Sequence, residues 1–159
     1  MSKEIVIGSD GSGFALKEAV KKHLIDLGYL VTDLGTQEAD KPMMYYLVAH
    51  EVALRISKGE FEKGILICGT GMGMSIVANK FPHVYAAVCE NTYAAAKARA
   101  INNANVLTMG GWITAPEVGC AVTDAFLTTD FLENLEDWRQ KNLIKAFSVV
   151  QEYEKENFK

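Results

Sequence analysis

A cysteine followed by three alternating glycines is the part of this sequence best suited to chemistry. Residues 68–75 (CGTGMGMS) follow an apolar run that predicts a strand and precede a pattern that predicts a helix. The glycines Gly69, Gly71 and Gly73 let backbone N–H groups approach a ligand, and a helix start favours negative charge. A thiol placed there is expected to form a thiolate readily, which makes Cys68 a candidate base or nucleophile. On spacing alone, Cys68 could equally be a small buried strand residue.

The spacing of these glycines excludes two common phosphate-binding motifs. A dinucleotide fingerprint reads GxGxxG, whereas this loop reads GxGxG. A P-loop ends in Gly-Lys-Ser/Thr, which does not follow here. The loop is therefore neither a dinucleotide fingerprint nor a P-loop.

Two further polar segments lie between predicted elements. Residues 8–13 (GSDGSG) follow the first predicted strand, and Asp10 there could hold a substrate hydroxyl. Taken alone, the segment is better explained if Asp10 and Ser12 cap the next helix. Residues 99–105 (RAINNAN) could form only a turn, because asparagine is common in turns.

Apolar runs rich in β-branched residues alternate with helical patterns along the chain. Strands alternating with helices of this length predict a Rossmann-like α/β fold, an open doubly wound sheet of five parallel strands flanked by helices. Ligands of such folds bind at the carboxyl ends of the strands, where the three polar segments begin. We expect strands at residues 4–8, 30–34, 64–68, 85–88 and 106–109, and helices at 14–28, 43–58, 75–80, 92–102, 115–127 and 137–155.

Length and composition restrict the class of protein. The 159 residues contain no linker or repeat, so we expect one domain over residues 1–159. A net charge of −4 argues against nucleic acid or an anionic membrane as partner, and no apolar run is long enough to span a bilayer. Three scattered cysteines argue against disulfides and a zinc site and favour the reducing cytoplasm.

In their order along the chain, the three segments resemble one enzyme family. GSDGSGFALK, ILICGTGMGMSIVANKFP and RAINNANVLTMGG are similar to the corresponding segments of type B ribose-5-phosphate isomerases and galactose-6-phosphate isomerase subunits. The resemblance implies an aldose–ketose isomerase of a small phosphorylated sugar that works through a cis-enediolate, without metal or organic cofactor. It also implies a homodimer, or a dimer of dimers, with active sites between subunits and the C-terminal helix packed on a partner chain.

The resemblance also implies roles for single residues. Cys68 would move the proton between the two carbons, assisted by Thr70, while the amides of Gly69, Gly71 and Gly73 would steady the enediolate oxygen. The remaining candidates for substrate binding are Asp10, Gly11, Ser75 and, from the partner chain, Asn102.

Several positions depart from the family pattern. A histidine usually follows the first-loop aspartate, where this chain has Gly11, and Ile101 replaces the histidine credited with opening the sugar ring. Trp112 stands where an arginine is expected, and the arginine-rich segment near the C terminus is replaced by residues 133–141. Arg99 and Arg139 remain candidate phosphate ligands, although either could simply face solvent.

These departures predict a substrate that needs no ring opening. A tetrose phosphorylated on its terminal carbon cannot close a five-membered ring, because the required hydroxyl is esterified. We therefore expect an open-chain tetrose or tetrulose phosphate, in a site that Ile101 or Trp112 could shorten. Three alternatives stay open. A water molecule or Thr70 could open the ring, so that a pentose or hexose phosphate is used. The chain could also be a subunit of a galactose-6-phosphate isomerase completed by a sister chain, or a catalytically silent sugar-phosphate binding protein.

Overall fold

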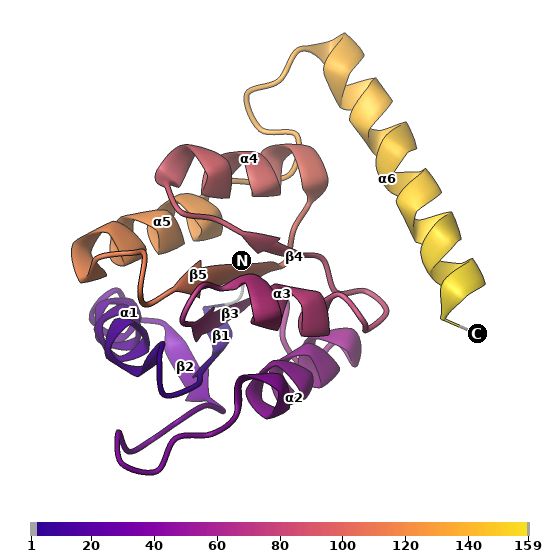
Figure 1. Cartoon of the computed structure of the whole chain (residues 1–159). Coiled ribbons are helices and arrows are strands. Elements are labelled where there is room, and N and C mark those ends of the chain that lie inside the picture. Colours follow the sequence, from indigo (N-terminus) through magenta and orange to yellow (C-terminus); the bar gives the residue numbers. More distant parts are fainter. Residues whose placement is uncertain (1–2, 159) are drawn as a thin grey trace.

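The computed structural model describes residues 3–158, and its centre is a parallel sheet between two helical layers (Figure 1). The strands are β1 (Glu4–Ser9), β2 (Leu30–Asp33), β3 (Gly64–Cys68), β4 (Ala86–Val88) and β5 (Val106–Gly110). The helices are α1 (Phe14–Asp26), α2 (Tyr45–Ser57), α3 (Met72–Ala78), α4 (Thr92–Asn102), α5 (Pro116–Thr128) and α6 (Asp137–Asn157).

The strand order determines where a ligand can bind. The five strands are parallel and run in the order β2-β1-β3-β5-β4. From β1 the chain moves outward to β2 and then crosses back to β3, so the order reverses between β1 and β3. In open α/β sheets, ligands bind outside the carboxyl ends of the strands at such a reversal. Asp10 and Cys68 lie at the ends of these two strands.

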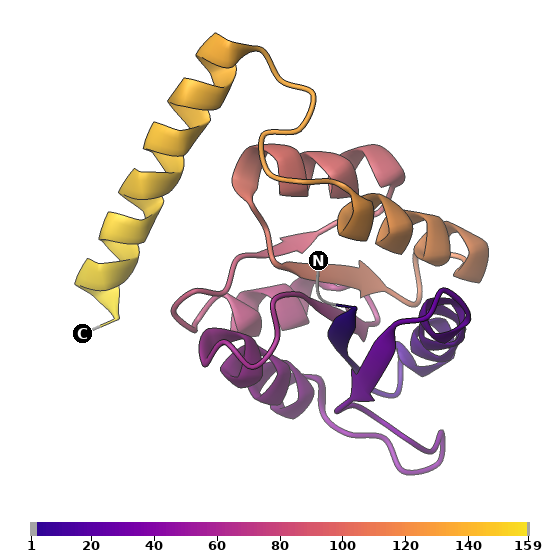
Figure 2. The same cartoon turned by 180° about the vertical axis from the view of Figure 1, so that it is seen from behind.

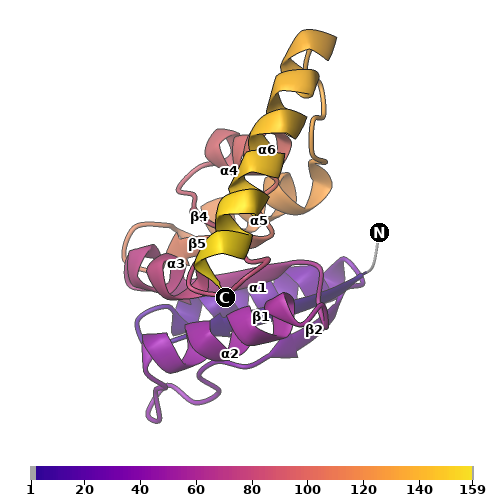
Figure 3. The ribbon, with the colours of Figure 1, turned by 90° about the vertical axis from the view of Figure 1, so that its right-hand side faces the viewer.

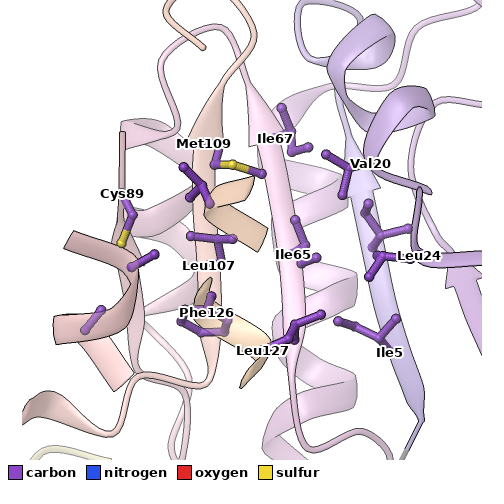
Figure 4. Close-up of a cluster of buried hydrophobic side chains, with 14 of the residues drawn as sticks. Ile5, Val20, Leu24, Ile65, Ile67, Cys89, Leu107, Met109, Phe126 and Leu127 are labelled. Carbon is purple, nitrogen blue, oxygen red and sulfur yellow. The ribbon is translucent and has the colours of Figure 1, made fainter. Parts of the chain in front are cut away.

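Alternating strand residues build a separate core on each face of the sheet. Ile7, Ile65 and Leu107 belong to the core under α1, α4 and α5, part of which Figure 4 shows. Val6, Leu66 and Cys68 belong to the core under α2 and α3. This two-sided burial explains why the strands are apolar throughout instead of alternating apolar with polar residues. It also places the Cys68 side chain on the α2/α3 face.

The predicted sheet and all six helices are confirmed, with one difference that matters for the site. The helix expected at 75–80 begins at Met72 and ends at Ala78. Gly71 precedes it with a φ of 77°, a left-handed conformation that glycine adopts without steric cost. This turn starts α3 three residues earlier than predicted, so the helix begins directly beside Cys68.

The C-terminal helix stands apart from the two layers. Figures 1 and 2 show α6 alongside the body beyond β4 and α4, and Figure 3 shows it crossing that side of the molecule. Phe147 packs against the Tyr85 ring, with centroids 5.1 Å apart. Near the other end of α6, buried Glu154 accepts hydrogen bonds from the His83 backbone and the Tyr85 hydroxyl. The helix is therefore fixed to the loop before β4 at two of its residues, and a groove lies beneath its earlier turns. In the described part of the chain, no helix is both long and apolar enough to cross a bilayer.

Candidate active site

A cavity of about 300 Å³ lies at the carboxyl ends of β1, β3 and β5. Cys68 lines it, and its volume is at the lower end of the size range of small-molecule sites. Its lining comes from four separate segments of the chain, which the strand order brings together: Asp10, Ser12, Tyr45, Cys68, Gly69, Thr70, Gly73 and Trp112.

Cys68 is the last residue of β3, and a backbone hydrogen bond holds its sulfur. Its side chain is only 6% exposed, yet it lines the cavity. The backbone N–H of Gly71 donates a hydrogen bond to Sγ over 3.1 Å. This contact holds the sulfur in place at the end of β3. The Gly71 amide thus acts on the thiol, whereas the sequence analysis assigned it to a substrate oxygen.

The start of α3 supplies further polar groups beside the thiol. Gly73 lines the cavity, and its amide precedes the first helical hydrogen bond, which Ser75 donates to Gly71. Amides at this place have no helical acceptor and can bind an oxygen of a ligand. The hydroxyl oxygen of Thr70 accepts from Met72 N–H over 3.3 Å, which leaves the hydroxyl proton free to be donated.

The loop after β1 carries Asp10 to the cavity. Its carboxylate accepts a hydrogen bond from the Gly13 N–H over 2.9 Å, within the turn that precedes α1. The N-cap residue of α1 is Gly13 and no side chain caps the helix, so the interpretation that Asp10 and Ser12 cap it is wrong. Asp10 lines the cavity, where its carboxylate can meet a substrate. Gly13 permits this close packing, since a Cβ there would come within 2.3 Å of the Ile67 carbonyl oxygen.

Two aromatic rings form the walls of the cavity, and each lies against a glycine. A Cβ on Gly69 would come within 2.8 Å of the Trp112 indole, and a Cβ on Gly73 within 2.8 Å of the Tyr45 ring. Larger residues at either glycine would displace the rings. The alternating glycines therefore do two things: they expose backbone amides, and they make room for aromatic walls.

A buried lysine holds the segment that carries Tyr45. Lys17 is fully buried, and its ammonium binds the carboxylate of Asp33 and the carbonyl of Thr36. The Thr36 hydroxyl in turn accepts from the Met43 N–H over 3.0 Å, two residues before Tyr45. Burial raises the pKa of Asp33, but hydrogen bonds from lysines outweigh it and the pKa is lowered. The segment before α2 is thereby fixed by a charged pair in the protein interior.

Two predicted substrate ligands point away from the cavity. Ser75 is buried and donates to the Ala86 carbonyl over 3.4 Å, so it joins α3 to β4. The buried guanidinium of Arg99 donates to the carbonyls of Thr129 and Ala104. These bonds, with a third to Asn103 Oδ1, tie the side chain into the fold, and Arg99 does not line the Cys68 cavity. Its role as a phosphate ligand stays a prediction.

The other predicted residues lie elsewhere on the surface. Gly11 is exposed in the loop after β1, where a Cβ would come within 2.8 Å of Pro42. Arg139 lies in the first turn of α6 and does not line the Cys68 cavity. Asn102 is exposed at the end of α4 and lines the groove beneath α6 together with Ile101.

That groove has a volume of about 360 Å³ and is largely apolar. The apolar residues of α6 that were expected to meet a neighbouring chain, Leu143, Ala146, Phe147 and Val150, line it from one side and face this chain's own domain. The Cys68 cavity and Asn102 therefore belong to two separate hollows of the monomer.

Sequence reasoning missed Tyr45 as a site residue and anticipated that Trp112 could line the site. Tyr45 was assigned only to a helix, and no local pattern distinguishes it from its neighbour Tyr46. Trp112 was noted as a departure from the family pattern, but its position against Gly69 depends on the pairing of β3 with β5. Among residues 3–158, no group of three or more His, Cys, Asp or Glu side chains is placed to hold a metal ion.

Comparison with known proteins agrees with this geometry. The chain is 58% identical over 147 residues to the 4-deoxy-4-sulfo-D-erythrose isomerase of Clostridium sp. (strain MSTE9), covering 92% of each protein. It is 37% identical to ribose-5-phosphate isomerase B of Escherichia coli (strain K12), covering 94% of this chain and 97% of that protein. Identity to the D-erythrulose-4-phosphate isomerase of Pectobacterium atrosepticum is 39%, over 80% of this chain and 84% of that one.

Solved structures show the same fold. Ribose-5-phosphate isomerase B of Clostridium thermocellum superposes with a TM-score of 0.82 at 35% identity, over 94% of this chain and 99% of that chain. The type B enzyme of Trypanosoma cruzi gives a TM-score of 0.86 at 31% identity, over 97% and 99%. A model of the Ribose/Galactose Isomerase family matches residues 5–146. The chain is an isomerase and belongs to the Ribose/Galactose Isomerase family.

Proposed function

We propose that this protein interconverts a four-carbon aldose and ketose whose C4 carries a sulfonate, 4-deoxy-4-sulfo-D-erythrose and the corresponding erythrulose. The observation that carries the proposal is the 58% identity to an enzyme of that name over nearly the whole chain. Features of the site support it independently.

The cavity suits proton transfer between adjacent carbons. Sγ of Cys68 takes the proton from C2 of the aldose, the C2–H electrons form the C1=C2 bond, and O1 takes the negative charge. The proton then returns to C1 while the hydroxyl proton of O2 moves to O1, which leaves a carbonyl at C2. The Gly73 amide and the Thr70 hydroxyl support the enediolate oxygens from the same side as the thiol.

The residues at the ring-opening positions favour a substrate that is already open. Gly11 and Ile101 stand at the two family histidine positions and cannot move a proton. A tetrose whose C4 bears a sulfonate has no C4 hydroxyl, so it cannot close a five-membered ring. An open chain presents its aldehyde directly to the thiol, and the histidines are not needed.

The charge of the cavity favours a sulfonate over a phosphate. None of its lining residues in the described chain is a lysine, arginine or histidine, and Asp10 is acidic. A phosphate monoester carries a charge of roughly −1.5 to −2 at pH 7, whereas a sulfonate carries a single negative charge. A site with few cationic side chains loses less affinity for the singly charged group.

A phosphorylated tetrose is the second candidate substrate. The similarity to D-erythrulose-4-phosphate isomerases of Pectobacterium atrosepticum and Mycolicibacterium smegmatis, at 39% and 36% identity, favours it. The ring-closure argument applies equally, because the C4 hydroxyl is then esterified. The two candidates differ only in the terminal anion.

Active sites that lie between the subunits of a homodimer complete the proposal. Asn102 is exposed at the end of α4, away from the Cys68 cavity of its own chain. A partner chain could bring its Asn102 to this cavity, in keeping with the family resemblance. The enzyme would act in the cytoplasm, and its substrate would be a small anionic sugar.

A substrate panel tests the proposed activity. The purified chain is assayed alone with 4-deoxy-4-sulfo-D-erythrose, erythrose 4-phosphate, ribose 5-phosphate and galactose 6-phosphate. We expect kcat/KM to be highest for the sulfo sugar, followed by erythrose 4-phosphate. A higher value for ribose 5-phosphate or galactose 6-phosphate contradicts the proposal. Inactivity on all four substrates would favour a silent binding protein or a subunit that needs a sister chain.

A further inference from the structure

A large aromatic side chain stands exposed at the mouth of the cavity. Trp112 is 74% exposed, although tryptophan is usually well covered in folded proteins. One face of its indole lies against Gly69, the residue that follows Cys68. The ring therefore packs on little of its own domain and lines the place where substrate binds.

The backbone around Trp112 is tied to the segment that carries the thiol. Gly111 N–H donates to the Cys68 carbonyl over 2.7 Å, and Trp112 N–H donates to the Gly69 carbonyl over 3.0 Å. Thr114 N–H closes the turn onto the Gly110 carbonyl over 2.9 Å. The indole thus stands on a tight turn that is fixed relative to Cys68.

The start of this turn, at Gly110, has no room to shift toward Gly69 and Thr70. A Cβ on Gly110 would come within 2.7 Å of the Thr70 Cα, so the two backbones already touch. The backbone that carries the indole cannot retreat without breaking the hydrogen bonds to residues 68 and 69, so only rotation of the ring about its own side-chain bonds could lengthen the cavity.

We propose that Trp112 is a specificity-determining residue that limits the length of the sugar chain to four carbons. The inference rests on the proposed function and deepens it. A substrate that places C2 at Cys68 extends toward the cavity mouth, where the indole limits the remaining length. A fifth carbon then collides with the ring or moves C2 away from the thiol. Misfit by one carbon changes discrimination by about 10–200-fold in other enzymes.

Binding of open-chain acids measures chain length without ring opening or turnover. 4-Phospho-D-erythronate and 5-phospho-D-ribonate carry the same charged groups and differ by one CHOH unit. Calorimetry on the full-length protein gives the ratio of their Kd values. We expect the wild type to bind the four-carbon acid roughly 10-fold more tightly or better. Trp112→Ala should bring the ratio close to one, and Trp112→Phe, which keeps an aromatic wall, should preserve most of it.

Matched variants control for loss of an exposed aromatic residue. Trp138 is 64% exposed on α6 and Tyr93 is 73% exposed on α4, and neither lines the cavity. Trp138→Ala and Tyr93→Ala should leave the ratio unchanged. Equal binding of both acids by the wild type, or an unchanged ratio in Trp112→Ala, overturns the role of Trp112. The proposed function is tested separately, because the kcat/KM values of the wild type in the substrate panel do not depend on the ratio of these two Kd values.

Fluorescence gives a second readout that survives loss of activity. The chain has only two tryptophans, so Trp138→Phe leaves Trp112 as the sole emitter. Saturation with 4-phospho-D-erythronate should shift its emission to shorter wavelength, because the ligand displaces water from the indole. Emission that does not change at saturation would show that Trp112 does not meet the ligand.

Discussion

The backbone N–H of Gly71 donates a hydrogen bond to Sγ of Cys68 over 3.1 Å, across the first turn after β3. This contact places a proton donor on the thiol of a residue that is almost completely buried but faces the cavity. It fixes the position of the sulfur, as a proton-transferring base requires. The chemistry assigned to Cys68 therefore depends on the left-handed conformation of Gly71.

Replacement of Cys68 by alanine should abolish most of the activity. A positioned acid–base group contributes about 10²–10⁴-fold to rate, so kcat of Cys68→Ala should fall by that factor. Steady-state kinetics on the preferred tetrose measures it. Cys89→Ala and Cys120→Ala are the matched controls and should keep kcat within a few-fold, because neither thiol lines the cavity. Near-full activity of Cys68→Ala would contradict its role as the base.

Alkylation should distinguish the three thiols. Burial raises the pKa of Cys89 to about 11, and its side chain is only 2% exposed. Burial, Asp124 and Glu117 also raise the pKa of Cys120. Both stay protonated at pH 8, and because the thiolate is the nucleophile they should react slowly. Iodoacetamide should therefore modify Cys68 first, and loss of activity should parallel that modification. Mass spectrometry of digested protein reports the order.

Protection by ligand provides the control for alkylation. Saturating 4-phospho-D-erythronate should slow both modification of Cys68 and loss of activity. Inactivation that follows modification of Cys89 or Cys120 instead would contradict the assignment.

Removal of the buried lysine should destabilise the fold. Lys17→Met removes the buried partner of Asp33 and leaves the Thr36 carbonyl without its donor, while Lys21 still pairs with Asp33 over 2.8 Å; the free energy of unfolding should fall by about 1–3 kcal/mol. Lys22→Met is the matched control, because the Lys22–Asp26 pair is exposed and should contribute less than about 1 kcal/mol. Urea denaturation at pH 7 measures both. Equal effects of the two substitutions would show that burial of the pair is unimportant.

The same pair predicts a dependence of stability on pH. The pKa of Asp33 is lowered in the fold, so its contribution is fully present above its ordinary value of 3.8. That contribution is lost as pH falls through the folded pKa. The stability difference between wild type and Lys17→Met should therefore be constant near neutral pH and shrink only in strong acid.

Mixing two inactive variants tests whether the site is shared between chains. If each site combines Cys68 of one chain with Asn102 of its partner, Cys68→Ala and Asn102→Ala homodimers should both be impaired. Random exchange into mixed dimers should restore about a quarter of the wild-type sites, since one of the two sites in each heterodimer is intact. Mixtures no more active than their components would contradict a shared site, and sedimentation showing an active monomer would exclude it.

The sequence determined the sheet and the position of the chemistry along it. Apolar runs such as residues 64–68 predict buried parallel strands. Helices cover both faces of such a sheet, so every side chain in these strands is apolar or small. The alternating glycines after Cys68 predicted a backbone that approaches a ligand, and the cavity lies there. Local composition carries this information because both features arise within a few consecutive residues.

Only the tertiary structure decided which side chains reach the cavity. Arg99 and Ser75 are polar residues near predicted site segments, but the fold directs both to backbone carbonyls. Trp112 follows β5, and it reaches Gly69 because β5 pairs directly with β3. The contact between Trp112 and Gly69 joins residues more than forty positions apart, and all three arrangements depend on strand order and side-chain direction. Neither strand order nor side-chain direction is encoded in the local pattern of residues.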